Sequence, residues 1–123
     1  MADSRHLYGS AGEEQALRHC LGLGYELLER NWRCKNGEID LIFRDGDTIV
    51  FMEVKARRSA GEWGDPAEAI TVWQQRRIVR ASLTYLKSRH LFQCDLRFDA
   101  VLIAADSLTH LKAAFPVDMP YFF

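Results

Sequence analysis

The sequence predicts an α/β protein, a sandwich in which a central mixed β-sheet is flanked by helices. Three observations indicate this class. Two apolar runs of strand character flank a short turn at residues 44–47, a basic helical pattern follows them, and a further apolar strand pattern covers residues 96–104. Because the run from Ile49 to Val54 is apolar at nearly every position, its strand is expected to be covered on both faces.

The size of the chain predicts one domain. It has 123 residues and is 48% hydrophobic, which is enough for one core and too little for two, so a single domain is expected over residues 1–123. The first ten residues lack the apolar region of a signal peptide, and no run approaches the length of a membrane span. The three cysteines are widely spaced without a CxxC motif, which favours a reducing compartment. We therefore expect a cytoplasmic protein that does not contact the membrane.

The first expected element is a helix. Ser10 followed by Glu13 resembles a capping box and predicts a helix that runs to about Leu21. Glu14 precedes Leu17 by three residues, so both side chains are expected on the helix side that faces the core.

Three strands are expected next, at residues 25–33, 38–43 and 48–56, the last two joined as a β-hairpin. A second helix follows, beginning either at Asp65-Pro66 or at Thr71. Strands are expected at residues 96–104 and, as an edge strand, at 108–115.

The register of the hairpin decides where its charged side chains lie. If Gly46-Asp47 are the central turn residues, Asp40 lies directly opposite Glu53. If Asp45-Gly46 are central, Asp40 is one diagonal step away on the same face. Lys55 shares a strand face with Glu53, since side chains alternate along a strand. Either turn therefore gathers Asp40, Glu53 and Lys55 on one side of the sheet.

This group of side chains has the composition needed for metal-assisted phosphodiester hydrolysis. Mg²⁺ prefers carboxylate oxygens, and it can polarise a phosphoryl oxygen and lower the pKa of a bound water. Lys55 would supply a compact positive charge. If Glu14 also points in, three carboxylates and one ammonium have a formal charge of −2, which one divalent cation neutralises. The alternative is a structural ion pair between Asp40 or Glu53 and Lys55 or Arg57.

The charge of the chain is unevenly distributed. Residues 55–90 carry a net charge of +5, and the remaining residues carry −6. A positive segment on a nearly neutral protein is typical of a polyanion-binding face, although a solvated helix surface has the same appearance. The candidate nucleic-acid-binding residues are Arg57, Arg58, Arg76, Arg77 and Arg80.

The sequence resembles the D…ExK core of the PD-(D/E)xK nuclease superfamily in GEIDLIF (37–43) followed by VFMEVKAR (50–57). It is most similar to the bacterial YraN-like uncharacterised family, which is related to archaeal Holliday junction resolvases. The resemblance covers nearly the whole chain. Its further motifs are GEEQAL (12–17), WGDPAEAIT (63–71), QQRRI (74–78), ASLTYL (81–86), RFDAV (97–101) and HLKAAF (110–115).

This resemblance implies a restriction-endonuclease-like fold with a Mg²⁺ or Mn²⁺ cofactor. It implies that Asp40 and Glu53 are metal ligands and that Lys55 is the catalytic lysine. Glu14 would match the acidic residue of the first helix, as a further ligand or its support, and Gln75 the polar residue on the helix after the core.

The chain departs from the YraN-like pattern at one position. Members of that family usually have a lysine near position 74, where this chain has Gln74. The missing charge weakens the case for phosphate binding at this position, although Arg76 and Arg77 follow directly.

The leading hypothesis is therefore a Mg²⁺-dependent endonuclease acting on DNA, with branched or damaged DNA as candidate substrates. A non-catalytic nucleic-acid-binding module with the same fold is the alternative, and a protein-interaction domain is the third hypothesis. Action on two strands at once would favour a homodimer.

Structural roles are expected for four other polar or aromatic residues. Trp63 and Trp73 could stack on bases, but tryptophans more often fill a core or hold a loop in place. Arg97 and Asp99 alternate with apolar residues and are expected to form a salt bridge rather than a catalytic pair.

Overall fold

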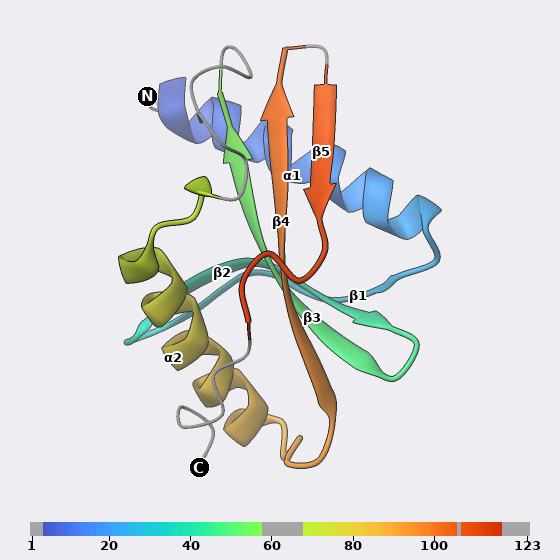
Figure 1. Cartoon of the computed structure of the whole chain (residues 1–123), viewed down its shortest axis with the longest axis vertical. Helices are drawn as coiled ribbons and strands as arrows, with labels where there is room; N and C mark the ends of the chain where they lie inside the picture. The colour runs from blue at the N-terminus through green and yellow to red at the C-terminus, as the bar shows by residue number, and fades with distance from the viewer. Residues whose placement is uncertain (1–3, 58–67, 106, 117–123) are drawn as a thin grey trace.

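The computed structural model describes residues 4–57, 68–105 and 107–116, with side chains from residue 11 onward. Figure 1 shows a strongly twisted sheet with two helices packed against it, which confirms the predicted α/β class. The elements in chain order are α1 (Ser4–Gly22), β1 (Glu26–Cys34), β2 (Gly37–Asp45), β3 (Thr48–Ala56), α2 (Val72–Ser88), β4 (Asp95–Ala104) and β5 (Ser107–Leu111).

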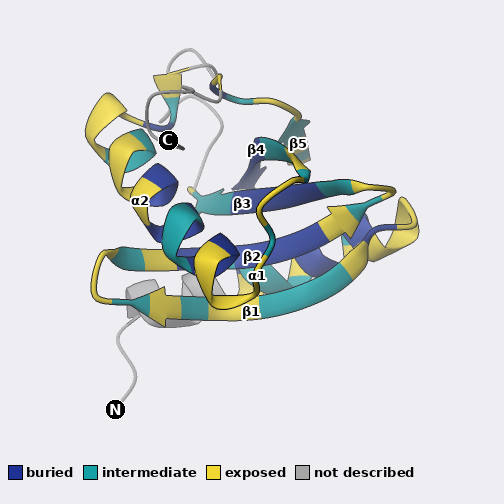
Figure 2. Ribbon diagram, turned by 90° about the horizontal axis from the view of Figure 1, so that it is seen from below, coloured by how far each residue is buried: buried dark blue, intermediate teal, exposed yellow. Residues whose placement is uncertain are grey.

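The sheet is mixed and has the strand order β1-β2-β3-β4-β5. The pairs β1–β2, β2–β3 and β4–β5 are antiparallel, and β3–β4 is parallel. A parallel pair needs a crossover connection, and the segment that contains α2 supplies it. The central strand β3 thus has partners on both edges. Figure 2 shows buried residues along β2, β3 and β4, whereas β1 is intermediate or exposed.

Each face of the sheet carries its own apolar cluster. The first cluster joins α1 to one face; its buried residues are Ala16, Leu17, Cys20, Tyr25, Leu41, Phe43, Val50, Met52, Val101 and Ile103. The second joins α2 to the other face and includes Ile39, Ile42, Ile49, Phe51, Ile78, Val79, Tyr85, Phe98 and Leu102. Alternation along β3 explains the division, since Val50 and Met52 face α1 whereas Ile49 and Phe51 face α2. The expected sandwich, with central strands covered on both sides, is confirmed.

Two element boundaries differ from those expected. The first helix already begins at Ser4, so the prediction of a cap at Ser10 is wrong. No proline interrupts residues 4–9, and the helix extends through the local capping pattern. The edge strand ends at Leu111 rather than at residue 115.

The second helix confirms one of its two predicted starts. Thr71 caps it, and its side-chain oxygen accepts a hydrogen bond from the Gln74 backbone N–H at 3.1 Å. Gln74 completes the capping box by accepting from the Thr71 N–H. Residue 74 therefore has a local structural role in this chain. The other predicted start, Asp65-Pro66, lies outside the described residues.

The hairpin adopts the first of the two predicted registers. Asp45 pairs with Thr48, and Leu41 pairs with Met52, so Gly46-Asp47 are the central turn residues. Gly46 has φ +60°, in the left-handed region that favours glycine. No described helix is long and apolar enough to cross a membrane.

Candidate functional site

The candidate site lies where β2 and β3 separate. Their ladder ends at the Leu41–Met52 pair, whereas β3 remains paired with β4 as far as Ala56. The next residue of β2 is Asp40 and the next of β3 is Glu53, so the observed register sets these two acids against each other at the end of the ladder. The structure thus has one of the two predicted registers, and this register brings both acids to the end of the β2–β3 ladder.

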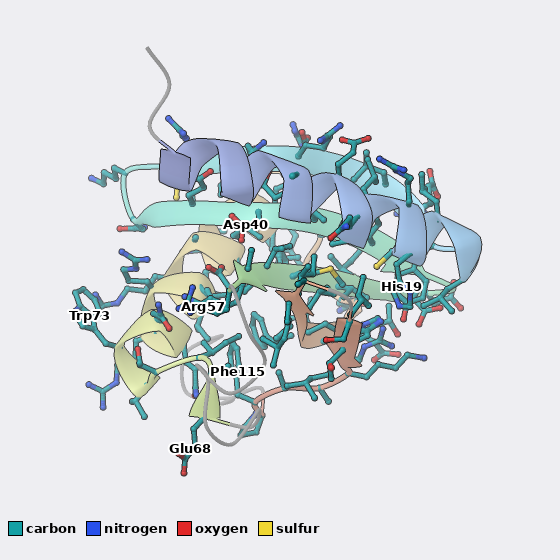
Figure 3. All side chains as sticks on the ribbon, turned by 90° about the horizontal axis from the view of Figure 1, so that it is seen from above. His19, Asp40, Arg57, Glu68, Trp73 and Phe115 are labelled. Atoms are coloured by element: carbon teal, nitrogen blue, oxygen red, sulfur yellow. The ribbon has the colours of Figure 1, made fainter. Side chains whose placement is uncertain are left out.

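Asp40 occupies a position at which side-chain alternation breaks. Its neighbours pack on opposite faces of the sheet, Ile39 in the cluster under α2 and Leu41 in the cluster under α1. The Asp40 Oδ2 atom accepts a hydrogen bond from the Val54 backbone N–H at 2.8 Å. The carboxylate therefore reaches across to β3 where the backbone ladder has ended, and Figure 3 shows it in the interior between the layers.

The facing residue of β1 explains this break. Arg30 pairs with Leu41 and Trp32 with Ile39, which leaves Asn31 beside Asp40. Asn31 has φ +49°, a left-handed conformation that asparagine tolerates better than most residues. The side chains of β1 and β2 therefore switch from one face of the sheet to the other at the same paired position, Asn31 and Asp40.

Glu53 and Lys55 lie on the face that α2 covers. They continue the alternation of Ile49 and Phe51, which belong to the cluster under that helix. Two residues along a strand correspond to about 6.6 Å. Both side chains are half-buried. The expectation that Glu53 and Lys55 share one face is confirmed.

The pKa of Asp40 is raised to about 7. Burial is the main cause, because it disfavours the charged form, and the negative charges of Glu13 and Glu38 act in the same direction. The hydrogen bond from Val54 and the positive charge of Lys55 oppose the rise without cancelling it. This carboxyl group therefore keeps its proton to a higher pH than an ordinary aspartate does.

The pKa of Glu53 is raised to about 8, again chiefly by burial, with the negative charge of Asp40 as the second cause. Lys55 and Arg77 lower it by their positive charges, which places both cations near the site. Since each acid disfavours ionisation of the other, the pair holds a proton more tightly than two separate carboxyls would.

The structural ion pair that the sequence left open is not observed. None of the salt bridges between described residues involves Asp40, Glu53, Lys55 or Arg57. Arg57 is exposed, and its guanidinium donates to the backbone carbonyl of Ala56 at 3.0 Å. Within the described part of the chain, neither acid forms an ion pair with a cationic side chain, and Asp40 has only the backbone hydrogen bond from Val54.

The acidic residue of α1 that acts on the site is not the one expected. Glu14 is half-exposed and forms a salt bridge with Arg30 of β1 at 2.8 Å, so it points toward the edge strand of the sheet. Glu13 is the helix residue whose charge raises the pKa of Asp40. The signal was present in the sequence, because Glu13 lies four residues before Leu17, on the same helix face. Whether Glu14 has a role in metal binding stays a prediction.

Gly12 explains how this turn of α1 comes close to the site. A Cβ atom at Gly12 would lie 3.3 Å from the Ala56 Cβ and 3.7 Å from the Val54 Cγ1. A larger residue would crowd the end of β3, so glycine lets the helix approach it closely. This contact is on the face of β3 opposite Glu53 and Lys55, and Glu13, the residue after Gly12, acts on Asp40 through its charge.

The remaining candidates lie on α2 or beside it. The Gln75 Nε2 atom donates to the Ile70 carbonyl at 3.0 Å, so this side chain supports the helix start. Arg76, Arg77 and Arg80 are exposed on α2. Arg58 and Trp63 lie outside the described residues.

The donor set of the site suits a hard divalent cation. Asp40 and Glu53 offer carboxylate oxygens, and with Glu13 and Lys55 the group has a net formal charge of −2. Mg²⁺ commonly uses only one or two protein carboxylates and completes its shell with water and phosphate. No three described His, Cys, Asp or Glu side chains form a ready-made metal cluster. The residues present thus fit a cation shared with a phosphate-bearing ligand better than an all-protein cage.

A second buried polar cluster lies on the opposite face of the sheet. Asp99 is 1% exposed and accepts two hydrogen bonds from Arg97, at 2.9 and 3.0 Å, which confirms the predicted salt bridge. It also accepts from the His110 Nε2 atom at 2.8 Å and from the Ala113 N–H at 3.0 Å. Burial alone would raise the pKa of Asp99, but these hydrogen bonds outweigh it and hold the pKa below its usual value.

Stabilisation by a divalent cation is expected to grow with pH. Protons compete with a cation for Asp40 and Glu53, and the raised pKa values place this competition around neutrality. The rise in melting temperature caused by Mn²⁺ should therefore be larger at about pH 8 than at about pH 6. Thermal unfolding with and without Mn²⁺ checks this, and a Glu53→Gln variant should show no such rise. An equal rise in melting temperature at both pH values would contradict metal binding by Asp40 and Glu53.

Comparison with known proteins places these residues in a family. Residues 12–103 match the uncharacterised protein family UPF0102. A UPF0102 protein of Geotalea uraniireducens (strain Rf4) is 44% identical over 119 residues, covering 93% of this chain and 92% of the relative. A UPF0102 protein of Caldicellulosiruptor saccharolyticus is 46% identical over 93 residues, covering 76% of this chain and 78% of the relative. A UPF0102 protein of Myxococcus xanthus is 36% identical over 119 residues, covering 94% of each chain.

Proposed function

This chain belongs to the UPF0102 family, and we propose that it is a divalent-metal-dependent nuclease that hydrolyses phosphodiester bonds in DNA. The proposal includes membership of the PD-(D/E)xK superfamily, whose D…ExK order Asp40, Glu53 and Lys55 follow. Branched or damaged DNA is the proposed substrate, in keeping with the resemblance to junction resolvases.

The observation that carries the proposal is a contrast between two aspartates of the sheet, the buried Asp99 and the half-buried Asp40. Asp99 accepts four hydrogen bonds, including two from a guanidinium, as a structural carboxylate should. Asp40 accepts only the bond from Val54 among the described residues, and it faces a second half-buried acid, Glu53. A purely structural site would not leave two repelling carboxyls without a cationic partner, since their burial costs stability. A cation supplied from solution would offset that cost.

Each residue then has a defined role. Asp40 and Glu53 hold the cation, and the hydrogen bond from Val54 fixes the Asp40 carboxylate in place. When bound, the cation would polarise the phosphoryl oxygen and lower the pKa of an attacking water. Lys55, on the same face as Glu53, offsets the negative charge that develops on the phosphate. Glu13 of α1 adds a further negative charge near Asp40, which makes binding of a cation more favourable.

The charge of α2 supports a nucleic-acid substrate. The helix contains three arginines and one lysine, and it contains no acidic residue. Its residue Arg77 lies close enough to Glu53 to lower the pKa of that acid. A phosphate backbone lying along α2 would thus lead to the carboxyl pair. The same charge would serve a non-catalytic nucleic-acid-binding module, which is the alternative function.

The test is a cleavage panel. Purified protein is incubated with linear, flapped and four-way DNA, with the corresponding RNA, and with Mg²⁺, Mn²⁺ or EDTA. The proposal expects cleavage of DNA that needs the metal and is lost in the Glu53→Gln variant. Binding without cleavage would favour the non-catalytic module. Absence of both binding and cleavage would leave a protein-interaction domain as the better reading.

A further inference from the structure

The first turn of α2 presents a large aromatic side chain to solvent. Trp73 is 65% exposed, and its neighbour Val72 is 61% exposed. Figure 3 shows Trp73 pointing away from the sheet at the outer side of the helix. The inward residues of α2, such as Ile78 and Tyr85, complete the core cluster without it. Trp73 therefore does not fill the core, which was one of the two structural roles expected for it.

An arginine packs against one face of the Trp73 ring. The guanidinium carbon of Arg77 lies 5.6 Å from the ring centroid, a cation–π arrangement between residues one helical turn apart. The charge of Arg77 also acts on Glu53. Arg77 also approaches the start of β2, because its carbonyl oxygen lies 4.0 Å from the position of a Cβ atom on Gly37, three residues before Asp40. The ring therefore belongs to the turn of α2 that passes the end of β2 carrying Asp40.

The surroundings of the ring favour a polyanion that carries flat groups. No acidic residue of α2 offsets Arg76, Arg77, Arg80 and Lys87. A protein partner would need a complementary acidic and apolar patch, whereas a nucleic-acid strand supplies phosphates and aromatic bases in alternation. Bases inside a duplex are already stacked on their neighbours, so only an unpaired base can lie on the ring.

We propose that Trp73, held by Arg77, is a stacking platform for an unpaired nucleobase next to the site of cleavage. The inference rests on the proposed function and narrows its substrate to nucleic acid with a single-stranded part, such as a flap, a gap or an open junction. Trp73 acts as a specificity residue: it contributes to strand binding and has no part in the hydrolysis itself.

The test measures binding rather than cleavage. Fluorescence anisotropy in EDTA follows a labelled oligothymidylate, the same strand with abasic sites at its centre, and a blunt duplex. Trp73→Ala is expected to weaken oligothymidylate binding by roughly 5- to 150-fold, the effect of losing one base stack. Duplex binding and the salt dependence should change by less than about twofold, because the phosphate contacts remain.

Matched variants separate stacking from other effects. Trp73→Phe keeps a ring and should retain most of the affinity, and Val72→Ala removes a neighbouring exposed side chain and should change nothing. The abasic strand should bind the wild type about as weakly as the normal strand binds Trp73→Ala, with no further loss when both changes are combined. Melting temperatures confirm that the variants are folded.

Several results would overturn the platform. Trp73→Ala could bind oligothymidylate like the wild type, or it could lose equal affinity for the duplex and the abasic strand, which would indicate general support of the surface. Failure of the nuclease proposal would be seen separately. If strand binding depends on Trp73 but the DNA panel shows no cleavage, the stacking platform stands and the protein is non-catalytic. Cleavage that is unaffected in Trp73→Ala, with unchanged strand binding, retains the nuclease and removes the platform.

Discussion

Replacing Glu53 by glutamine is expected to abolish cleavage and, at the same time, to stabilise the metal-free protein. Cleavage should fall by at least about 10³-fold, since the cation that the site would hold contributes several kcal/mol to transition-state stabilisation. Stability in EDTA at about pH 8 should rise by about 1–3 kcal/mol. The same pair of effects, with the same signs, is expected for Asp40→Asn. Urea unfolding and the cleavage assay measure the two effects independently.

The sign of the stability change follows from the raised pKa values. An acid whose pKa is higher in the folded protein than in the unfolded chain binds more protons when folded, so stability falls as pH rises from about 4 through the raised pKa. A neutral amide of the same shape avoids this loss. The advantage of the glutamine variant should therefore be small at about pH 5 and largest at about pH 8.

Two control variants make this prediction specific. Lys55→Met should also abolish cleavage, yet it should lower metal-free stability, because the charge of Lys55 favours ionisation of both acids. Asp47→Asn, on an exposed turn residue, should change neither quantity. If Glu53→Gln destabilises the metal-free protein, the two acids are structural and the metal-site assignment fails.

Replacing Asp99 by alanine is expected to destabilise the protein by about 3–5 kcal/mol, the usual effect of removing one partner from a buried ion pair. The change leaves Arg97 with Asp45 and Tyr25 as its remaining hydrogen-bond partners and removes the acceptor of His110. The total stability of a domain is commonly 5–15 kcal/mol, roughly, so a substantial unfolded fraction should appear on warming. Chemical denaturation at neutral pH measures the loss.

Asp99→Asn tests the charge separately from the packing. The lowered pKa of Asp99 means that its contribution is present above the unfolded value of about 4 and is lost as pH falls through the folded value. The asparagine variant should therefore be less stable than the wild type at neutral pH and approach it in acid. Equal stability at neutral pH would show that the hydrogen bonds to Asp99 do not need its charge.

The same chemical change, aspartate to asparagine, is thus expected to have opposite effects on the two faces of one sheet. At Asp99 the carboxylate is matched by a guanidinium, an imidazole and a backbone N–H. At Asp40 one backbone N–H donates, and the nearest charges include two other acids. This difference, rather than burial as such, separates a structural acid from a candidate ligand.

The sequence alone was sufficient for the features that depend on short-range pattern. Gly46-Asp47 and Asp45-Gly46 were both possible hairpin turns, and either one brings Asp40 near Glu53 and Lys55, which side-chain alternation places on one face. Thr71 was one of two possible starts of the second helix. These features are local because each depends on hydrogen bonds or alternation within a few residues.

Only the tertiary structure decided which acids come together and which are neutralised. The change of face at Asp40 needs Asn31 of a neighbouring strand, and the choice of Glu13 over Glu14 needs the close contact of Gly12 with Ala56. The partners of Asp99 come from two strands and the residues after β5, a combination that spacing in the sequence does not reveal. Charge composition is a property of the chain, whereas the electrostatic environment of each charge depends on the packing of distant segments.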